Sequence, residues 1–591
     1  MNIPLREYWR LLSRYLVSQR TAALWMALLL LGNTAIGLAT PQVERRFIDA
    51  ALAGASQPLL ARLAVAVLVV ALARQGLSVL ATYWAQRVAW TATNALRLDL
   101  AAHIVRLDLY FHKVRTPGEL IERIDGDVSA LLGFFSDFVV EVLGNLLLLV
   151  GILVTILIED VVLGVLFAVF ALLSIVFLSW IQRFAPPHWR AAREQFARYF
   201  GFVGETLTAA EDIRSCGAVE HALRRSLLHL RRWRPVQLRA SLWGSVWMVG
   251  IAVFTVGEVL IRGIGGPMVL NGAMSLGTLY MLARYLGLLV WGPLSNLQSK
   301  VEDLQHAQAS IVRVQELLDT TSALTEGAVA LPSGAPAVSY DRVSFAYQAD
   351  DLEAVTSDGF VLHDLSFHLG AGRVLGLLGR TGSGKTTVAR LLFRFYDPQQ
   401  GTIRLGDVDL RECKLDALRA RIGLVTQDVQ LLNASLRDNL TFFDPQVSDD
   451  DLLATLRALG LAQWVERLPA GLDTLISGET LSAGEAQLVA LARVFLKDPD
   501  LVILDEASSR LDPATEILLG QALDALLEGR SAVIIAHRLA TVERADDILI
   551  LERGRSIEHG SRLDLAADPR STFARLLRTR ARGAGIEEVL A

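Results

Sequence analysis

The stretch of sequence with the most recognisable chemistry is a glycine-rich loop that follows a short apolar run. Residues 373–387 read Arg-Val-Leu-Gly-Leu-Leu-Gly-Arg-Thr-Gly-Ser-Gly-Lys-Thr-Thr and match the pattern G-x-x-x-x-G-K-[ST]. Glycines let backbone N–H groups turn toward a phosphate, and the helix that follows presents its positive N-terminal end. Kinases, GTPases and motor ATPases share this motif, so it predicts a nucleotide site without naming the reaction. The predicted nucleotide-binding residues are Gly379, Arg380, Thr381, Gly382, Ser383, Gly384, Lys385, Thr386 and Thr387.

Polar residues at the ends of other apolar runs supply candidates for hydrolysis. Asp505 and Glu506 follow the run 501–504. Beside a phosphate-binding loop, an aspartate can hold Mg²⁺ together with Thr386, and a glutamate can polarise a water for attack on the γ-phosphorus. His537 ends a further apolar run and can hydrogen-bond the γ-phosphate. Such a histidine is by itself more often structural, and Gln427, which follows residues 422–426, is equally ambiguous alone.

The elements that must position these residues are strands. Residues 339–345 and 361–369 are expected to form antiparallel strands, whereas 374–378, 501–504 and 532–535 are continuous apolar runs typical of a parallel sheet buried on both faces. Open α/β sheets bind ligands at the carboxyl ends of their strands, where the polar candidates fall. The second half of the chain therefore predicts an α/β P-loop ATPase domain with an antiparallel β subdomain.

The first half of the chain carries the apolar excess of a composition that is 52% hydrophobic. Six segments come close to the roughly 20 residues needed to cross a bilayer core, which predicts an all-α, six-span domain with long helical extensions at 87–130 and 184–241. Residues 3–16 have the amphipathic spacing of an interfacial helix. The predicted spans are 21–43, 60–86, 131–158, 161–183, 242–264 and 276–298.

Charge next to the spans predicts their orientation. Arginines precede the first span and are frequent in the two long connections, although Arg45 and Arg46 run against this trend. The positive-inside rule then places both termini, the long loops and the ATPase domain in the cytoplasm, in a multi-pass protein of the cytoplasmic membrane. Ionisable residues inside the spans either line a substrate path or pair with one another, and the sequence leaves both open. These residues are Arg74, Asp137, Glu141, Glu258 and Arg284.

Composition and breaker residues bound the remaining organisation. We expect a transmembrane domain over 1–320, a linker over 321–337, a nucleotide-binding domain over 338–578 and a C-terminal tail over 579–591. The net charge of −5 and the lack of a basic tract give no reason to expect nucleic acid as a partner. Cys216 and Cys413 are the only two cysteines, and we expect both to be reduced.

The order of these motifs resembles the nucleotide-binding domain of the ABC transporter family. The resemblance is carried by Tyr347, 379–387, Gln427, Leu481-Ser482-Ala483-Gly484-Glu485, 501–506, 509–512 and His537. The six-span layout, with Thr116-Pro117-Gly118-Glu119 in its first long loop, resembles the exporter branch of that family.

The resemblance implies a role for each motif residue. Tyr347 would stack on adenine, Glu506 would be the general base, and His537 would contact the γ-phosphate. Gln427 would sense the nucleotide and, with Thr386 and Asp505, stand next to Mg²⁺; Asp512 is counted among the nucleotide-binding residues.

The family's assembly implies that one chain cannot make a complete site. Two such domains close face to face with ATP between the P-loop of one and the Leu-Ser-x-Gly motif of the other, so Ser482 and Gly484 would face the nucleotide held by a partner. The chain therefore looks like a half-transporter that dimerises.

The signature motif departs from the family pattern Leu-Ser-Gly-Gly-Gln. Ala483 adds a Cβ where backbone should approach phosphate, and Glu485 either brings negative charge toward the nucleotide or folds back as part of a capping box with Ser482. A weakened signature beside an intact Glu506 favours a heterodimer over a homodimer. The acidic stretch 350–358 is longer than the family usually shows.

The function expected from these features is ATP-driven export of a substrate by alternating access, with hydrolysis at the interface of two nucleotide-binding domains. The alternative is a nucleotide-gated channel or regulatory membrane protein in which ATP biases conformation without uphill transport. The motifs do not identify the transported substrate.

Overall fold

Two structural units make up the chain in the computed structural model. One contains residues 1–106 and 117–320, and the other contains residues 107–116 and 321–591. The described residues are 15, 19–133, 143–182, 184–244, 247–331, 333–347, 359–478, 480–505, 513–536 and 539–580.

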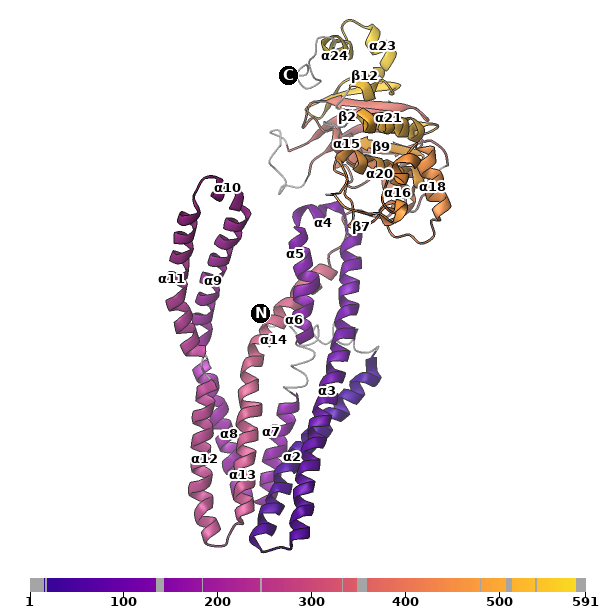
Figure 1. Cartoon of the computed structure of the whole chain (residues 1–591). Coiled ribbons are helices and arrows are strands. Elements are labelled where there is room, and N and C mark those ends of the chain that lie inside the picture. The colour runs from indigo at the N-terminus through magenta and orange to yellow at the C-terminus, as the bar shows by residue number, and fades with distance from the viewer. Residues whose placement is uncertain are drawn as a thin grey trace. The chain divides into compact units, whose positions relative to one another are not determined.

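The membrane unit is built from long apolar helices (Figure 1). Among the described residues, four helices are long and apolar enough to cross a membrane, and two shorter apolar helices accompany them. Each of the six predicted spans overlaps one of these helices, while the number of crossings stays a prediction. The helices are α2 (Arg20–Leu52), α3 (Gln57–Arg106), α7 (Gly144–Glu159), α8 (Val161–Gln182), α12 (Trp247–Leu270) and α13 (Leu276–Leu289).

The long connections are helical, as the sequence predicts. Helix α3 has 50 residues, which at 1.5 Å per residue is about 75 Å, more than twice the thickness of a hydrocarbon core of about 30 Å. Helices α9 (Ala185–Thr208) and α11 (Val219–Gly244) form a hairpin with the short α10 (Ala210–Ser215) at its tip (Figure 1). The other helices in the described part of this unit are α5 (Pro117–Ile121), a π-helical turn over Glu122–Asp127, α6 (Val128–Gly133), a second π-helical turn over Val290–Leu294, and α14 (Ser295–Leu318).

Several ionisable residues of the membrane unit form ion pairs. Arg284 bonds Glu44 at 3.0 Å and Glu258 pairs with Arg262, so the pairing alternative describes both. Arg45, which runs against the charge trend, bonds Glu159 at 2.7 Å. This ion pair largely cancels the charge of Arg45 at that end of the helices. Asp137, Glu141 and the interfacial helix other than Tyr15 lie outside the described residues.

The ATPase unit contains the two predicted sheets. Parallel pairing joins β3, β6, β9, β10 and β11, and an antiparallel β12 (Arg555–Ser561) completes the order β12-β11-β3-β10-β9-β6. Every residue of β3, β9 and β10 is buried, which explains their continuous apolar runs. The strands are β3 (Val374–Gly379), β6 (Ile422–Val425), β9 (Leu501–Asp505), β10 (Ser531–Ile535) and β11 (Asp547–Glu552).

The second sheet is the antiparallel subdomain. Its order is β2-β1-β4-β5, with Val338 opposite Leu369 in the first pair. It contributes to an apolar core that also contains residues of β3, β9 and β10. These findings confirm the predicted fold class. Its strands are β1 (Val338–Phe345), β2 (Leu362–Leu369), β4 (Gln400–Leu405) and β5 (Val408–Asp409).

Helices cover the six-stranded sheet, and a two-stranded ribbon of β7 (Ala434–Ser435) and β8 (Leu475–Ile476) pairs beside them. Among the described residues, the α-helices that follow β3 are α15 (Lys385–Leu392), α16 (Leu415–Arg421), α17 (Leu436–Thr441), α18 (Asp449–Ala458), α19 (Ala462–Glu466), α20 (Ala483–Leu496), α21 (Pro513–Leu527), α22 (Leu539–Val542), α23 (Arg562–Ala567) and α24 (Thr572–Arg580).

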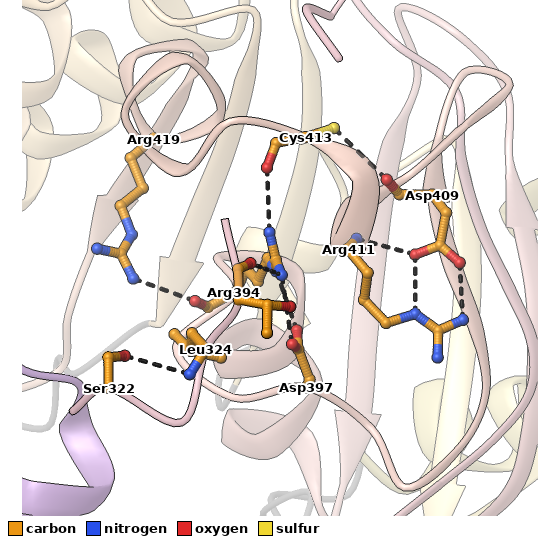
Figure 2. A network of polar contacts seen from close by, with 9 residues as sticks. Ser322, Leu324, Arg394, Asp397, Asp409, Arg411, Cys413 and Arg419 are labelled. Carbon is orange, nitrogen blue, oxygen red and sulfur yellow. Dashed lines mark hydrogen bonds and ion pairs between the residues drawn. The ribbon is translucent and has the colours of Figure 1, made fainter. Parts of the chain in front are cut away.

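The segment after α14 packs on the ATPase unit. Val329 N donates to Glu412 O at 2.9 Å, and Lys414 N donates back to Val329 O at 3.2 Å. The guanidinium of the fully buried Arg394 bonds Asp397, the Thr325 carbonyl oxygen and the Cys413 carbonyl oxygen (Figure 2). Part of the predicted linker therefore runs as an ordered segment along this unit.

Candidate ATP-binding site

The glycine-rich loop joins β3 to α15 in a conformation that requires glycine. Gly379 has φ 153° and Gly384 has φ 102°. A Cβ at Gly379 would overlap the carbonyl oxygen of Leu551, and one at Gly384 would lie 2.6 Å from Leu362 Cδ2. The neighbouring strands therefore hold the loop so closely that a larger residue would displace it.

Lys385 is the first residue of α15, and its ammonium reaches back to the loop. Its side chain is only 5% exposed, and Nζ donates to the carbonyl oxygens of Gly379 and Arg380 at 2.7 and 2.8 Å. Ser383 is buried too, and its carbonyl oxygen accepts from Gly554 N at 3.1 Å. A buried ammonium needs hydrogen-bond acceptors, and phosphate oxygens can accept from it as these carbonyls do.

The sheet brings Asp505 to the same edge as the loop. Ile535 of β10 pairs with both Leu377 of β3 and Asp505 of β9, so these three positions lie side by side. Asp505 is 7% exposed and ends its strand. On the other side of β9, Val425 of β6 pairs with Leu504. The sheet therefore aligns the ends of four strands at the predicted phosphate site.

The oxygen donors at this edge fit Mg²⁺. Thr386 is the second residue of α15, and Gln427 follows β6 with an exposed side chain. A hydroxyl, a carboxamide oxygen and the Asp505 carboxylate are hard oxygen ligands, and Mg²⁺ usually takes one or two protein groups together with phosphate and water. Among the described residues, no cluster of three His, Cys, Asp or Glu forms a separate metal site.

Tyr347 lies beside the loop helix. Its hydroxyl is 3.2 Å from Thr387 Oγ1 and accepts from Arg390 Nη1 at 3.3 Å. Its ring contacts Phe345 and Tyr396 at right angles, with centroid distances of 4.9 and 5.3 Å. The structure thus brings the predicted adenine platform next to the P-loop.

The signature segment forms a complete capping box at the start of α20. Ser482 Oγ accepts from Glu485 N at 3.3 Å and donates to Glu485 Oε2 at 2.9 Å, and Ser482 N also donates to Oε2 at 2.9 Å. The other carboxylate oxygen accepts from Trp464 Nε1 at 3.1 Å. Of the two alternatives for Glu485, the structure therefore favours the carboxylate folded back on its own helix.

The comparisons with known proteins agree with this architecture. The family profile described as "ABC transporter transmembrane region" matches residues 24–292, and the one described as "ABC transporter" matches residues 362–509. The chain is 30% identical over 480 residues to a fatty acid ABC transporter ATP-binding/permease protein of Mycobacterium bovis, covering 80% of this chain and 74% of that one. This chain belongs to the ABC transporter family.

Two further similarities extend over nearly the whole half-transporter. An ATP-dependent lipid A-core flippase of Legionella pneumophila is 28% identical over 609 residues, covering 100% of this chain and 99% of the flippase. A structure of a bacterial Atm1-family ABC exporter with ATP bound superposes with a TM-score of 0.77 at 26% identity, covering 95% of this chain and 98% of that one. The chain is thus an ABC exporter half-transporter whose ATPase drives export across a membrane.

Three predicted site residues lie outside the described part of the half-transporter, namely Glu506, His537 and Asp512. So does the acidic stretch 350–358. The structure also adds three residues that the motifs did not reveal, namely Trp464, Arg390 and Tyr396. No local sequence pattern links these residues to nucleotide chemistry. Only the tertiary fold brings them to Glu485 and Tyr347.

Proposed function

We propose that the half-transporter binds MgATP through Lys385, Thr386 and Asp505 and hydrolyses it with Glu506 as general base. The alignment of Asp505 with the P-loop at one sheet edge supports this assignment, because Glu506 follows Asp505 directly in the chain. Bound Mg²⁺ would neutralise charge that develops on the phosphates. His537 and Gln427 would orient the γ-phosphate and the attacking water, and Tyr347 would stack on adenine.

The test of the general base is Glu506→Gln in the purified transporter. ATP hydrolysis should fall by at least about a hundredfold, the lower end of a general-base contribution, while MgATP binding is kept. Unchanged hydrolysis in the variant would remove Glu506 from this role. The measurement should be made with and without a candidate partner chain, because one chain supplies only half of each site.

We further propose that the partner is a second, different half-transporter. The hydroxyl proton of Ser482 points to Glu485, whereas a phosphate only accepts hydrogen bonds. Ala483 also adds a Cβ where backbone should approach a partner's γ-phosphate. This signature would therefore support turnover poorly, and a partner with an intact signature would complete the active site on this chain's P-loop.

The double substitution Ala483→Gly with Glu485→Gln tests the heterodimer proposal. It restores the family pattern. When Glu506 of this chain is also changed to Gln, the site that uses this chain's signature should gain ATP hydrolysis. A Glu485→Asp variant is the matched control, since it keeps the charge. If this chain alone forms a dimer with full activity and the restored signature changes nothing, the heterodimer proposal is wrong.

The substrate class that we propose is an amphiphile with an apolar chain. A cavity of about 150 Å³ in the membrane unit has walls made of apolar residues and glycine, contributed by α8, α12 and α13. The similarity to a fatty acid transporter and a lipid A-core flippase supports the same class. The lining includes Leu163, Phe167, Phe170, Gly257, Leu260 and Leu286.

Stimulation of ATP hydrolysis by fatty acids of increasing length tests this class. Leu260→Trp narrows the cavity and should abolish stimulation by long chains. Leu172→Trp, on an exposed part of α8 outside the cavity lining, is the control and should keep it. Equal stimulation of both variants would contradict the assignment of the cavity.

A further inference from the structure

A short helix from the first long loop belongs to the ATPase unit. Helix α4 (Leu109–Val114) begins at Asp108, whose carboxylate accepts from Phe111 N at 3.1 Å. The same carboxylate accepts from Ser322 Oγ at 3.0 Å and from Ala323 N. Asp108 is buried. It therefore ties α4 to the segment that follows α14, the second place where the chain enters this unit.

Aromatic contacts hold the other side of α4. Leu109 and Tyr110 pack against the core that contains the antiparallel sheet. The rings of Tyr110 and Tyr396 meet at right angles with centroids 4.7 Å apart. Tyr396 in turn contacts Tyr347. Through this pair of contacts, α4 reaches the predicted adenine platform.

Lys113 of α4 contacts the Tyr347 ring directly. Its Nζ lies 4.1 Å from the centroid of the Tyr347 ring, well within the range of a cation–π interaction. Tyr347 is only partly buried and packs against a core that includes Phe345 and Tyr396. Its hydroxyl is held at Thr387 and Arg390. The ammonium thus covers a part of the ring that the core leaves accessible.

We propose that Lys113 and the adenine ring of ATP compete for the Tyr347 ring, so that α4 senses whether the nucleotide site is filled. The proposal rests on the role of Tyr347 proposed above. A base that stacks on this ring needs van der Waals contact with its face, which an ammonium at 4.1 Å already occupies. When adenine replaces Lys113, α4 loses this contact while the Asp108 bonds keep it attached to the unit. Lys113 is a positioning residue and takes no part in hydrolysis.

A double-mutant cycle on the full-length transporter tests the competition. In a Glu506→Gln background, we expect Lys113→Met to lower the Kd for ATP about two- to fivefold, the range expected for loss of an exposed cation–π contact. Tyr347→Leu should raise the Kd at least about fivefold, as for loss of one stacked base. In the Tyr347→Leu background, Lys113→Met should have no effect, because the shared ring is absent.

Two controls separate competition from simple electrostatics. Inorganic tripolyphosphate has no base, so its affinity should not change in Lys113→Met. Lys414→Met removes the same charge from an exposed position of the same unit and should leave the affinity for ATP unchanged.

Hydrogen exchange in residues 107–116 should rise on addition of ATP, and stay unchanged on addition of tripolyphosphate.

The outcomes distinguish this proposal from the one on which it rests. If Tyr347→Leu leaves the Kd for ATP unchanged, Tyr347 is not the adenine platform and both ideas are lost. If Tyr347→Leu weakens binding but Lys113→Met leaves the Kd unchanged or raises it, the platform stands and the competition is refuted. An equal effect of Lys113→Met in both backgrounds also refutes it.

Discussion

At the scale of single residues, Arg394 shows how a charge inside the ATPase unit is accommodated. The side chain has no exposed surface, and its backbone has φ 52°, which is uncommon for a residue other than glycine. The guanidinium cannot lose its proton, so it needs acceptors. Asp397 and two backbone carbonyl oxygens supply them, one from Thr325 and one from Cys413 (Figure 2). The residue therefore joins the segment before β1 to the buried chain at Cys413.

Arg394→Met should destabilise the ATPase unit by about 3 kcal/mol, because it strands one carboxylate and two carbonyl groups around a buried site. Arg411→Met is the matched control. Arg411 bonds Asp409 at 2.7 Å with 41% of its side chain exposed, so its loss should cost no more than about 1 kcal/mol. Scanning calorimetry of the full chain measures both. Equal shifts of the unfolding transition in the two variants would contradict the structural role of Arg394.

At the scale of elements, polar contacts join α2 to α13 and α7. Tyr285 Oη donates to Leu38 O at 2.8 Å, and Asp49 Oδ1 accepts from Gly277 N at 2.9 Å. Arg45 of α2 bonds Glu159 at the end of α7. A conformational change that separates these helices must break these contacts, so their strength sets part of its free energy.

The Arg45–Glu159 pair predicts a charge-swap rescue. Arg45→Glu should lower substrate-stimulated ATPase and thermal stability, since it places two carboxylates together at positions that are partly buried. Adding Glu159→Arg should restore both properties in large part. Arg46→Glu, at the neighbouring exposed position, serves as the control and should have little effect. Failure of the double variant to recover would show that the pair does not contribute through its charges.

At the scale of the whole molecule, the two cysteines report on orientation. Cys216 is exposed near the tip of the α9–α11 hairpin, whereas Cys413 is buried. Burial also raises the pKa of the Cys413 thiol, which lowers its reactivity because the thiolate is the nucleophile. The native chain therefore carries one accessible thiol, on a loop that we expect in the cytoplasm.

A membrane-impermeant maleimide should label the protein in inside-out vesicles and leave it unlabelled in intact cells. Cys216→Ser should abolish the labelling, and Cys413→Ser should leave it unchanged. Labelling of intact cells through Cys216 would reverse the predicted orientation of both termini and the ATPase unit.

Much of the site was predictable because its residues are consecutive in the chain. The loop at 379–387 needs glycine for its own backbone, and the buried strands that end at Gly379 and Asp505 appear as unbroken apolar runs. Glu485 was not predictable. Its sequence position allowed either a capping box or a charge near the nucleotide, and the Trp464 indole, which comes from α19, holds the carboxylate on its own helix.

The order of residues along the chain was enough to predict the two kinds of unit, the parallel strands and the phosphate-binding loop, because hydrophobic periodicity and glycine placement act over a few residues. Three contacts could be found only in the folded chain: Lys113 covers Tyr347, Asp108 accepts from Ser322, and Arg394 reaches Thr325. Each of these contacts joins segments far apart in the chain. Their energy comes from burial and hydrogen bonding that exist only once the core has formed, and no local pattern records it.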